Sequence, residues 1–202
     1  RRNVLIVGTS DDNGKRTIKA FRDRFTERGG TIAGSISVAD APGDISAQLR
    51  SYDSADAVFL AVRGSTARAL APQLTLAGFA GKSRVGTSQL VAGTSKVEDD
   101  LALDGIVYPS ETWTALGVSG LPSASQVSST LPSARGPGAR LFAFGFDAWR
   151  ITAYPEKLTT GTDGGLRGAT GTLHLDGFGN VLRTPAWSTF NGGRPTPIVD
   201  GR

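Results

Sequence analysis

Residues 4–16 read VLIVGTSDDNGKR, and this stretch decides the fold that the sequence predicts. Its first four residues are all apolar, which is typical of a strand covered on both faces. The polar turn that follows leads into a predicted helix over 14–28, where Ile18, Phe21 and Phe25 share one face. A buried strand followed by an amphipathic helix is the repeating unit of a parallel sheet.

The same alternation continues through the first hundred residues. Further strands are predicted at 31–38, 56–62, 84–87 and 105–108. The strand at 31–38 alternates apolar and polar residues, which indicates a place nearer the edge of the sheet than the strands at 4–7 and 58–62. Helices are predicted over 44–52 and 65–77, and Pro72 is expected to kink or divide the second of them.

The second half of the chain has a different composition. Residues 109–138 are rich in Ser, Pro and Gly and predict a crossing segment or surface excursion. Residues 139–154 form a helix that is apolar around most of its circumference, so it is expected to be buried. Residues 170–187 predict a hairpin that turns between Asp176 and Asn180, and the tail 191–202 is expected to be irregular.

The aromatic helix has no obvious sheet to cover it within the chain. We therefore infer a second lobe, whose sheet comes mostly from residues upstream of Arg1. The predicted division is a ligand-binding-like lobe at 1–109 and 166–198, and a crossing segment with part of the second lobe at 110–165. The alternative is that the helix packs on the open face of the first sheet.

Composition excludes several classes of function. The chain of 202 residues carries 22 basic and 18 acidic side chains, and they are dispersed, so no nucleic-acid partner is expected. Cysteine is absent, which excludes disulfides, thiolate metal sites and a lipid attached through a Cys of this chain. No apolar run approaches the roughly 18 residues of a membrane-spanning helix. Because the chain begins Arg1-Arg2 and has no methionine, residues upstream are expected to be missing.

The candidate catalytic motifs fail on their spacing. Residues 8–16 resemble a phosphate loop, but five residues separate the glycines and Arg16 stands where Ser or Thr would hold magnesium. No nucleophile elbow or Ser-x-x-Lys pair is present, and His174 falls on the polar side of the predicted hairpin. Asp99-Asp100 is the nearest candidate for a hard cation and is read as a loop acid pair. We expect no metal, no cofactor and no catalytic residue.

A ligand cleft is still compatible with this pattern. In open α/β sheets, ligands bind beyond the carboxyl ends of the strands. The side chains expected there are Thr9, Ser10, Arg63, Ser65, Thr87, Ser88 and Tyr108. Hydroxyls, one guanidinium and one phenol could hold a polar small molecule such as an amino acid or a peptide end. The other interpretation is that these residues only cap helices and form turns.

Three stretches carry a resemblance to a known family. They are ADAVFLAV at 55–62, ARLFAFGFDAWR at 139–150, and GATGTLHLD at 168–176 with Trp187, Phe190, Gly192 and Pro195 after it. Together they resemble the C-terminal domain of the LppC/LpoA family of penicillin-binding protein activators, over about two thirds of that domain. The order of elements is similar to type I periplasmic-binding-protein folds, which implies an α/β fold with one complete parallel-sheet lobe and part of a second.

The resemblance also implies a function. Members of this family are outer-membrane lipoproteins that face the periplasm, bind a class A peptidoglycan synthase and stimulate its cross-linking without doing chemistry. The membrane would be reached only through a lipid anchor outside this chain. Two other classes remain open: a periplasmic solute receptor that closes on an amino acid or peptide, and a doubly wound enzyme with a nucleotide cofactor.

Overall fold

The computed structural model describes residues 3–91, 96–158 and 165–199. The chain falls into two compact units. Unit 1 comprises the described residues up to Tyr108 together with Thr189–Arg194, and unit 2 comprises Pro109–Ser188 and the described residues from Pro195 onward. The chain passes from one unit to the other within the strands β5 (Ile106–Ser110), β9 (Ala186–Asn191) and β10 (Arg194–Ile198).

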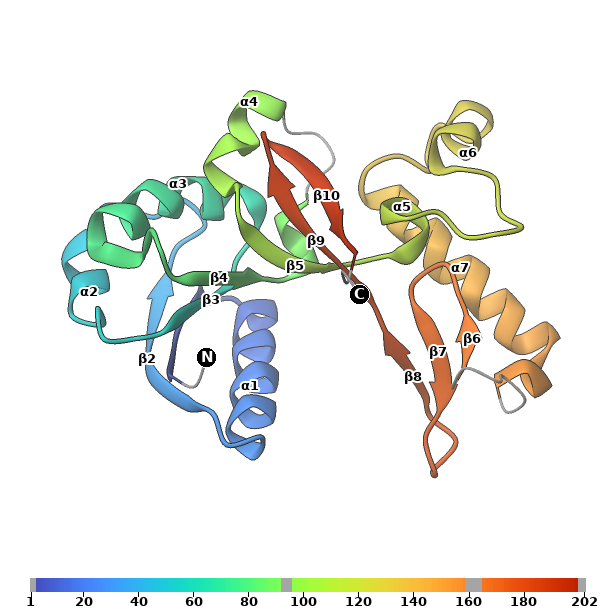
Figure 1. The fold of residues 1–202 in the computed structure, drawn as a ribbon, viewed down its shortest axis with the longest axis horizontal. Helices are drawn as coiled ribbons and strands as arrows, with labels where there is room; N and C mark the ends of the chain where they lie inside the picture. The colour runs from blue at the N-terminus through green and yellow to red at the C-terminus, as the bar shows by residue number, and fades with distance from the viewer. Residues whose placement is uncertain (1–2, 92–95, 159–164, 200–202) are drawn as a thin grey trace. The chain divides into compact units, whose positions relative to one another are not determined.

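Unit 1 is built from strands that alternate with helices (Figure 1). Its strands are β1 (Asn3–Thr9), β2 (Thr31–Val38), β3 (Ala57–Ala61), β4 (Ser83–Gly86) and the start of β5. Its longer helices are α1 (Asp12–Glu27), α2 (Ser46–Arg50) and α3 (Gly64–Leu74), followed by the π-helical turn η1 (Thr75–Phe79). Short turns η2 (Ser88–Leu90), α4 (Val97–Asp100) and η3 (Leu101–Leu103) lead into β5.

The strands form one sheet with the order β10-β9-β5-β4-β3-β1-β2. Strands β1 to β5 pair in parallel, with β1 and β3 inside the sheet and β2 at its edge, as the sequence predicted. Successive side chains of a strand point to opposite faces. Leu5 and Leu60 accordingly join the core beneath α2 and α3, whereas Phe59 packs under α1, where its ring stacks 3.9 Å from that of Phe21. The predicted α/β fold is confirmed.

Pro72 does not divide its helix. Helix α3 continues through Pro72 to Leu74, and the helical path is interrupted six residues beyond the proline, at Gly78, where φ is +88°. A proline in a helix removes one backbone donor, and that loss is tolerated here because the next turns continue to pack against the core through Leu74 and Phe79. Glycine adopts the positive φ that ends the helix without steric cost.

Unit 2 combines helices with a small antiparallel sheet (Figure 1). Its helices are α5 (Thr112–Ala115), α6 (Ala124–Thr130), α7 (Pro137–Ala153) and the turn η4 (Pro155–Leu158). The sheet has the order β6-β7-β8, from β6 (Leu166–Arg167), β7 (Thr172–Leu175) and β8 (Val181–Thr184). The predicted hairpin is confirmed as β7 and β8, which pair with His174 opposite Leu182.

Sequence reasoning overlooked α6 within the Ser-rich segment. The helix begins with a capping box, in which the Gln126 amide donates to Ser123 Oγ at 3.3 Å and the Ser123 amide donates to Gln126 Oε1 at 2.8 Å. This reciprocal pair satisfies two helix-end donors and is a recognisable start signal. Segment 109–138 is therefore partly helical and not a plain crossing segment.

Helix α7 is only partly buried, which corrects the expectation of a fully buried rod. Its buried side chains are Ala139, Ala143 and Asp147, spaced four residues apart on one face. On the remaining circumference Leu141 is 73% exposed and Trp149 is 57% exposed. Within the described residues, the apolar contacts of the helix are with the cluster around Trp113 and, through Ile151, with Leu158, Leu166 and Leu173.

Two predictions for the C-terminal part of the chain differ from the structure. The hairpin region 166–188 belongs to unit 2, because Leu166 and Leu173 pack with Ile151 and Leu158. The tail was expected to be irregular, and that expectation is wrong: β9 and β10 form around the turn Gly192-Gly193, whose φ values are +57° and +70°.

Candidate functional site

The predicted cleft residues of unit 1 gather mostly at one edge of the sheet. Gly8 of β1 lies opposite Ala61 of β3, and Leu60 of β3 lies opposite Gly86 of β4, so these three strands end together. The candidate residues at or just after the ends of these strands are Thr9, Ser10, Arg63, Ser65, Thr87 and Ser88.

The polar atoms at this edge already serve the local structure. Thr9 is 6% exposed and its hydroxyl hydrogen-bonds to the carboxylate of Asp11. Asp11 caps α1 by accepting the Gly14 amide at 2.7 Å. Thr87 accepts the Gln89 amide at 3.3 Å with its side chain. Ser10, Arg63 and Ser65 are exposed, so they are the side chains of this edge that solvent reaches most freely.

Tyr108 is separated from this group by burial. Its side chain is 2% exposed, and its ring packs 5.1 Å from that of Phe190. The phenol thus belongs to the core of unit 1 and offers almost no surface to a ligand in solvent.

Gly14 explains why residues 8–16 resemble a phosphate loop without being one. A Cβ at Gly14 would lie 2.2 Å from the carbonyl oxygen of Thr9, so the backbone approach itself requires glycine. The helix N-terminus is occupied by the Asp11 carboxylate, which would repel a phosphate. Sequence reasoning rejected nucleotide binding here, and the geometry supplies a structural role for the glycine.

The Asp11 cap gives a pH-dependent prediction. Hydrogen bonds from Gly14 and Thr9, with the positive charge of Arg63, lower the pKa of Asp11 below its usual range. A lowered carboxyl pKa adds stability that is present above the unfolded-state pKa of about 4 and is lost as pH falls through the folded-state value. We expect wild type to resist urea better than Asp11→Asn at pH 6, and this advantage to shrink as the pH falls to 2.5. An advantage of equal size at both pH values, measured by circular dichroism, would contradict the role of the charge.

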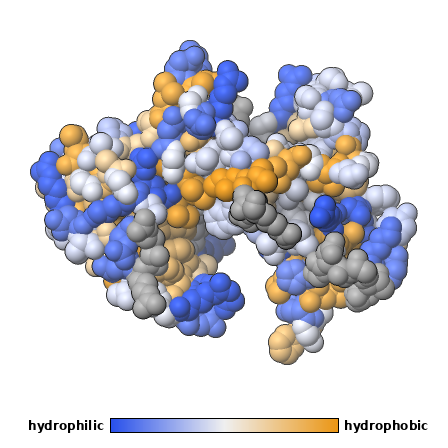
Figure 2. All heavy atoms as spheres, in the orientation of Figure 1, coloured by the Kyte–Doolittle hydropathy of each residue, from blue (hydrophilic) through white to orange (hydrophobic). Residues whose placement is uncertain are grey.

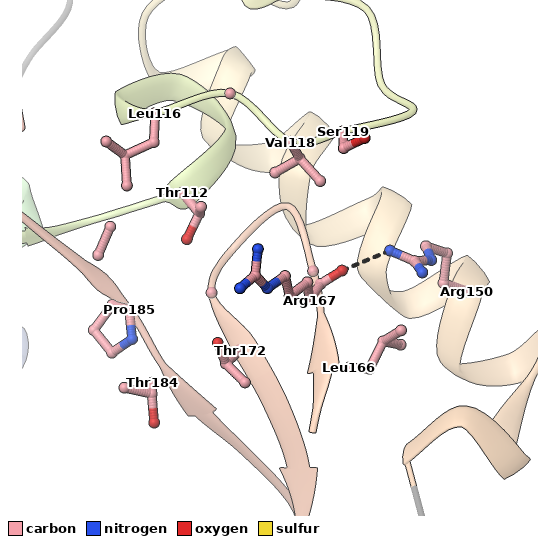
Figure 3. Close-up of a pocket in the computed structure, with 14 residues that line it drawn as sticks. Thr112, Leu116, Val118, Ser119, Arg150, Leu166, Arg167, Thr172, Thr184 and Pro185 are labelled. Carbon is pink, nitrogen blue, oxygen red and sulfur yellow. Dashed lines mark hydrogen bonds between the residues drawn. The ribbon is translucent and has the colours of Figure 1, made fainter. Parts of the chain in front are cut away.

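Unit 2 contains a pocket that sequence reasoning missed (Figure 3). Its volume is about 620 Å³. It is lined by Thr112, Leu116, Gly117, Val118, Ser119, Arg150, Leu166, Arg167, Gly168, Gly171, Thr172, Thr184, Pro185 and Ala186, all of which belong to unit 2. The lining comes from three places: the first residue of α5 with the loop after that helix, one residue of α7, and the strands β6 to β8 with their connections and the start of β9.

One wall of the pocket is held by the buried carboxylate of Asp147. Its oxygens accept the Ala169 amide at 2.7 Å, the Thr170 amide at 2.8 Å and the Thr170 hydroxyl at 2.7 Å. These bonds fix the loop 168–171 against α7. Both ends of the loop need glycine, since a Cβ at Gly168 would lie 2.6 Å from Asp147 Oδ2 and one at Gly171 would lie 2.3 Å from the Thr184 carbonyl oxygen. The motif GATG with an Asp on the preceding helix is the signal that could have located this wall.

Two further buried acidic groups, Asp100 and Glu111, each form an ion pair. Asp100 pairs with Arg68 at 2.8 Å, and the predicted acid pair Asp99-Asp100 lies in the short helix α4 and not in a loop. Glu111 pairs with Arg140 at 2.8 Å. Within 3–91, 96–158 and 165–199, no group of three His, Cys, Asp or Glu residues is placed to hold a metal ion. In the same residues, no helix combines the length and apolarity that crossing a bilayer requires.

Besides the sheet edge of unit 1 and the pocket of unit 2, the exposed tip of the β7–β8 hairpin is a third candidate site. Phe178 is 92% exposed there, and a small pale-orange group of atoms marks the hairpin tip in Figure 2. Asp176 fixes the turn by accepting the amides of Phe178 and Asn180, each at 2.8 Å. Hydrogen bonds from the Asn180 side chain and amide, together with the one from the Phe178 amide, lower the pKa of Asp176, so the carboxylate that fixes the turn is charged at neutral pH.

Comparisons with known proteins give a family and a fold. The family model described as "LppC putative lipoprotein" matches residues 43–193. No curated protein matches the sequence. The C-domain of LpoA (YraM) from Haemophilus influenzae, described as a regulator of PBP1A, is 19% identical with a TM-score of 0.74, over 98% of this chain and 62% of that one.

Two further solved structures are similar to this chain. Full-length LpoA from Haemophilus influenzae is 20% identical with a TM-score of 0.79, over 99% of this chain and 36% of that one. A leucine-binding protein from Thermotoga maritima is 18% identical with a TM-score of 0.64, over 98% of this chain and 60% of that one. This chain thus spans less than two thirds of each of these structures, and the similarity confirms a periplasmic-binding-protein-like fold.

Proposed function

Because the chain belongs to the LppC lipoprotein family, we propose that it is part of a non-enzymatic envelope protein that binds and activates a class A penicillin-binding protein. The activity regulated would be the cross-linking of peptidoglycan, and through it cell shape. The protein would lie on the periplasmic face of the outer membrane, attached through a lipid outside this chain. No nucleic acid and no cofactor take part.

The family match over residues 43–193 is the observation that carries this proposal. It includes most of unit 1 and the described residues 109–158 and 165–188 of unit 2. The structural similarity to the LpoA C-domain, a regulator of PBP1A, agrees with it. The non-enzymatic part is supported by the buried acids Asp100, Glu111 and Asp147, each of which is held by a structural partner.

We place the binding anchor at the tip of the β7–β8 hairpin. Binding energy at protein interfaces concentrates in a few residues, and aromatic side chains are frequent among them. Phe178 is a fully presented aromatic ring on a turn that Asp176 already fixes, so binding would cost little ordering of the chain.

The test uses the full-length protein and a purified class A penicillin-binding protein. We expect the two to bind in a surface-based affinity measurement, and the fraction of cross-linked peptide in the synthase's product to rise when the protein is added. Failure of the wild-type protein to bind or to stimulate would refute the proposed function.

A matched pair of variants tests the anchor. Phe178→Ser removes the exposed ring from unit 2, while Leu76→Ser removes a side chain that is 71% exposed in unit 1. We expect Phe178→Ser to weaken binding at least tenfold, a typical loss for a central aromatic residue, and Leu76→Ser to leave it unchanged. Equal effects of the two would place the anchor elsewhere without refuting the activator role.

The second candidate function is a periplasmic solute receptor for an amino acid or peptide. It is favoured by the exposed Ser10, Arg63 and Ser65 at the ligand-binding edge of a parallel sheet. A receptor would gain thermal stability from millimolar amino acids or dipeptides, and Arg63→Gln would abolish that gain. The absence of any stabilisation across such a panel excludes this function.

A further inference from the structure

We propose that the pocket of unit 2 binds a small ligand in which a carboxylate stands next to a short apolar group, with Arg167 as the anion-binding residue. This inference does not depend on the activator role, since it concerns a different surface from the hairpin tip. It also differs from the receptor alternative, which uses residues of unit 1.

The charge of the pocket favours an anion. Two of the lining residues are arginines, and none is acidic. Arg150 is committed to the structure: its Nη1 donates to the Arg167 carbonyl oxygen at 2.7 Å, and its guanidinium lies 5.7 Å from the centre of the Phe146 ring. Arg150 therefore braces β6 against α7 and contributes its positive charge to the wall.

The side chain of Arg167 is available to a ligand. It is exposed, and Figure 3 shows it extending from β6 into the space ringed by the labelled lining residues. Among the residues that the structure describes, no hydrogen bond or ion pair engages its guanidinium. The hydrogen bonds that the Asp147 carboxylate accepts within the described residues come from the loop 168–171 and not from Arg167.

Hydroxyl groups around the pocket supply further donors. Thr112, Ser119, Thr172 and Thr184 line it from three different segments. Within the described part of the chain, none of these four hydroxyls has a hydrogen-bond partner in the protein. A set of free hydroxyls around one free guanidinium is suited to a polar head group that accepts several hydrogen bonds.

The remaining lining selects the class of anion. Leu116, Val118, Leu166 and Pro185 provide apolar surface beside the polar groups. A planar guanidinium binds a carboxylate through two parallel hydrogen bonds, and the single free guanidinium balances one negative charge better than the two of a phosphate. The volume of about 620 Å³ lies within the range of small-molecule sites. A monocarboxylate with a short aliphatic group fits all three features.

The test compares two probes that differ only in charge. N-acetyl-leucine carries the carboxylate, whereas N-acetyl-leucinamide replaces it with a neutral amide of nearly the same shape. Each is titrated into the ¹⁵N-labelled chain at low salt, and binding is followed by amide chemical shifts. We expect saturable shifts at Gly168, Gly171 and Val118 with the acid, and at least tenfold weaker binding of the amide, as the loss of one charge-assisted contact predicts.

Variants then assign the binding to Arg167. Arg167→Gln is expected to weaken the acid about tenfold or more and to leave the amide unchanged. Thr184→Val, which keeps the shape and removes a hydroxyl, is expected to weaken the acid to a smaller degree. Arg22→Gln makes the same charge change on the exposed surface of α1 and should have no effect. The proposal is overturned if the acid shows no saturable binding, if acid and amide bind equally, or if Arg167→Gln binds the acid as wild type does.

Discussion

Replacing Asp147 with alanine is expected to destabilise unit 2 by about 3 to 5 kcal/mol, the cost typical of leaving buried donors without their charged acceptor. The side chain is 4% exposed and accepts three hydrogen bonds from Ala169 and Thr170. Water cannot readily replace it at that depth. All three tryptophans, Trp113, Trp149 and Trp187, belong to unit 2, so their fluorescence in a urea titration measures this loss directly.

Asp147→Asn provides the graded comparison. It keeps the volume and one acceptor oxygen but turns an amide nitrogen toward a donor, so its unfolding midpoint should lie between those of wild type and Asp147→Ala. Asp23→Ala, on the exposed surface of α1, serves as the control and should leave the fluorescence transition in place. A midpoint of Asp147→Ala within error of wild type would mean that the carboxylate does not hold the loop 168–171.

Leu60→Ala should produce a loss of similar size in unit 1. Leu60 is fully buried near the end of β3, where it lies opposite Val7 and Gly86 of the flanking strands. Removing a leucine from such a site costs about 2 to 5 kcal/mol, because the surrounding strands relax only partly into the cavity. Hydrogen exchange in peptides from β1 and β3 should quicken accordingly.

An exposed leucine gives the matched comparison for that measurement. Leu76→Ala makes the same chemical change at a side chain that is 71% exposed, and it should alter stability by no more than about 0.5 kcal/mol. If the two variants exchange at the same rate in β1 and β3, the core beneath α2 and α3 does not stabilise the sheet as its burial indicates.

The parallel-sheet half of the molecule could be predicted from periodicity, because the pattern of apolar residues within each short segment indicates its strand or helix. Residues 4–7 and 58–62 are continuously apolar, so strands covered on both faces were evident, and the alternation at 31–38 correctly indicated an edge. The hairpin could likewise be predicted, from the turn residues Asp176-Gly177 and from the alternation around Leu173.

Errors arose where distant residues determine the structure. Phe190 pairs with Asp104 and packs on Tyr108, which no local pattern near residue 190 could reveal, so the tail was misread as irregular. The predicted boundary at 166 failed for the same reason, since Leu166 packs with Ile151 of α7.

The candidate site was predictable only in part. The alignment of strand ends at Thr9, Arg63 and Thr87 follows from the topology, whereas the burial of Tyr108 depends on Phe190. The pocket of unit 2 was missed because Arg167 lies in a two-residue strand that periodicity cannot detect, and because its wall depends on Asp147.

The return of Thr189–Arg194 to unit 1 has a consequence for how the protein is made. The amides of Gly192 and Gly193 donate to the Asp104 carboxylate at 2.9 and 2.8 Å, and Phe190 covers Tyr108. These partners are separated by more than eighty residues of chain. On the ribosome, strands β1 to β5 therefore emerge long before the segment that closes the outer side of β5. Until it arrives, Tyr108 and an unpaired strand edge stay open to solvent, and a nascent chain halted before Thr189 would be prone to self-association.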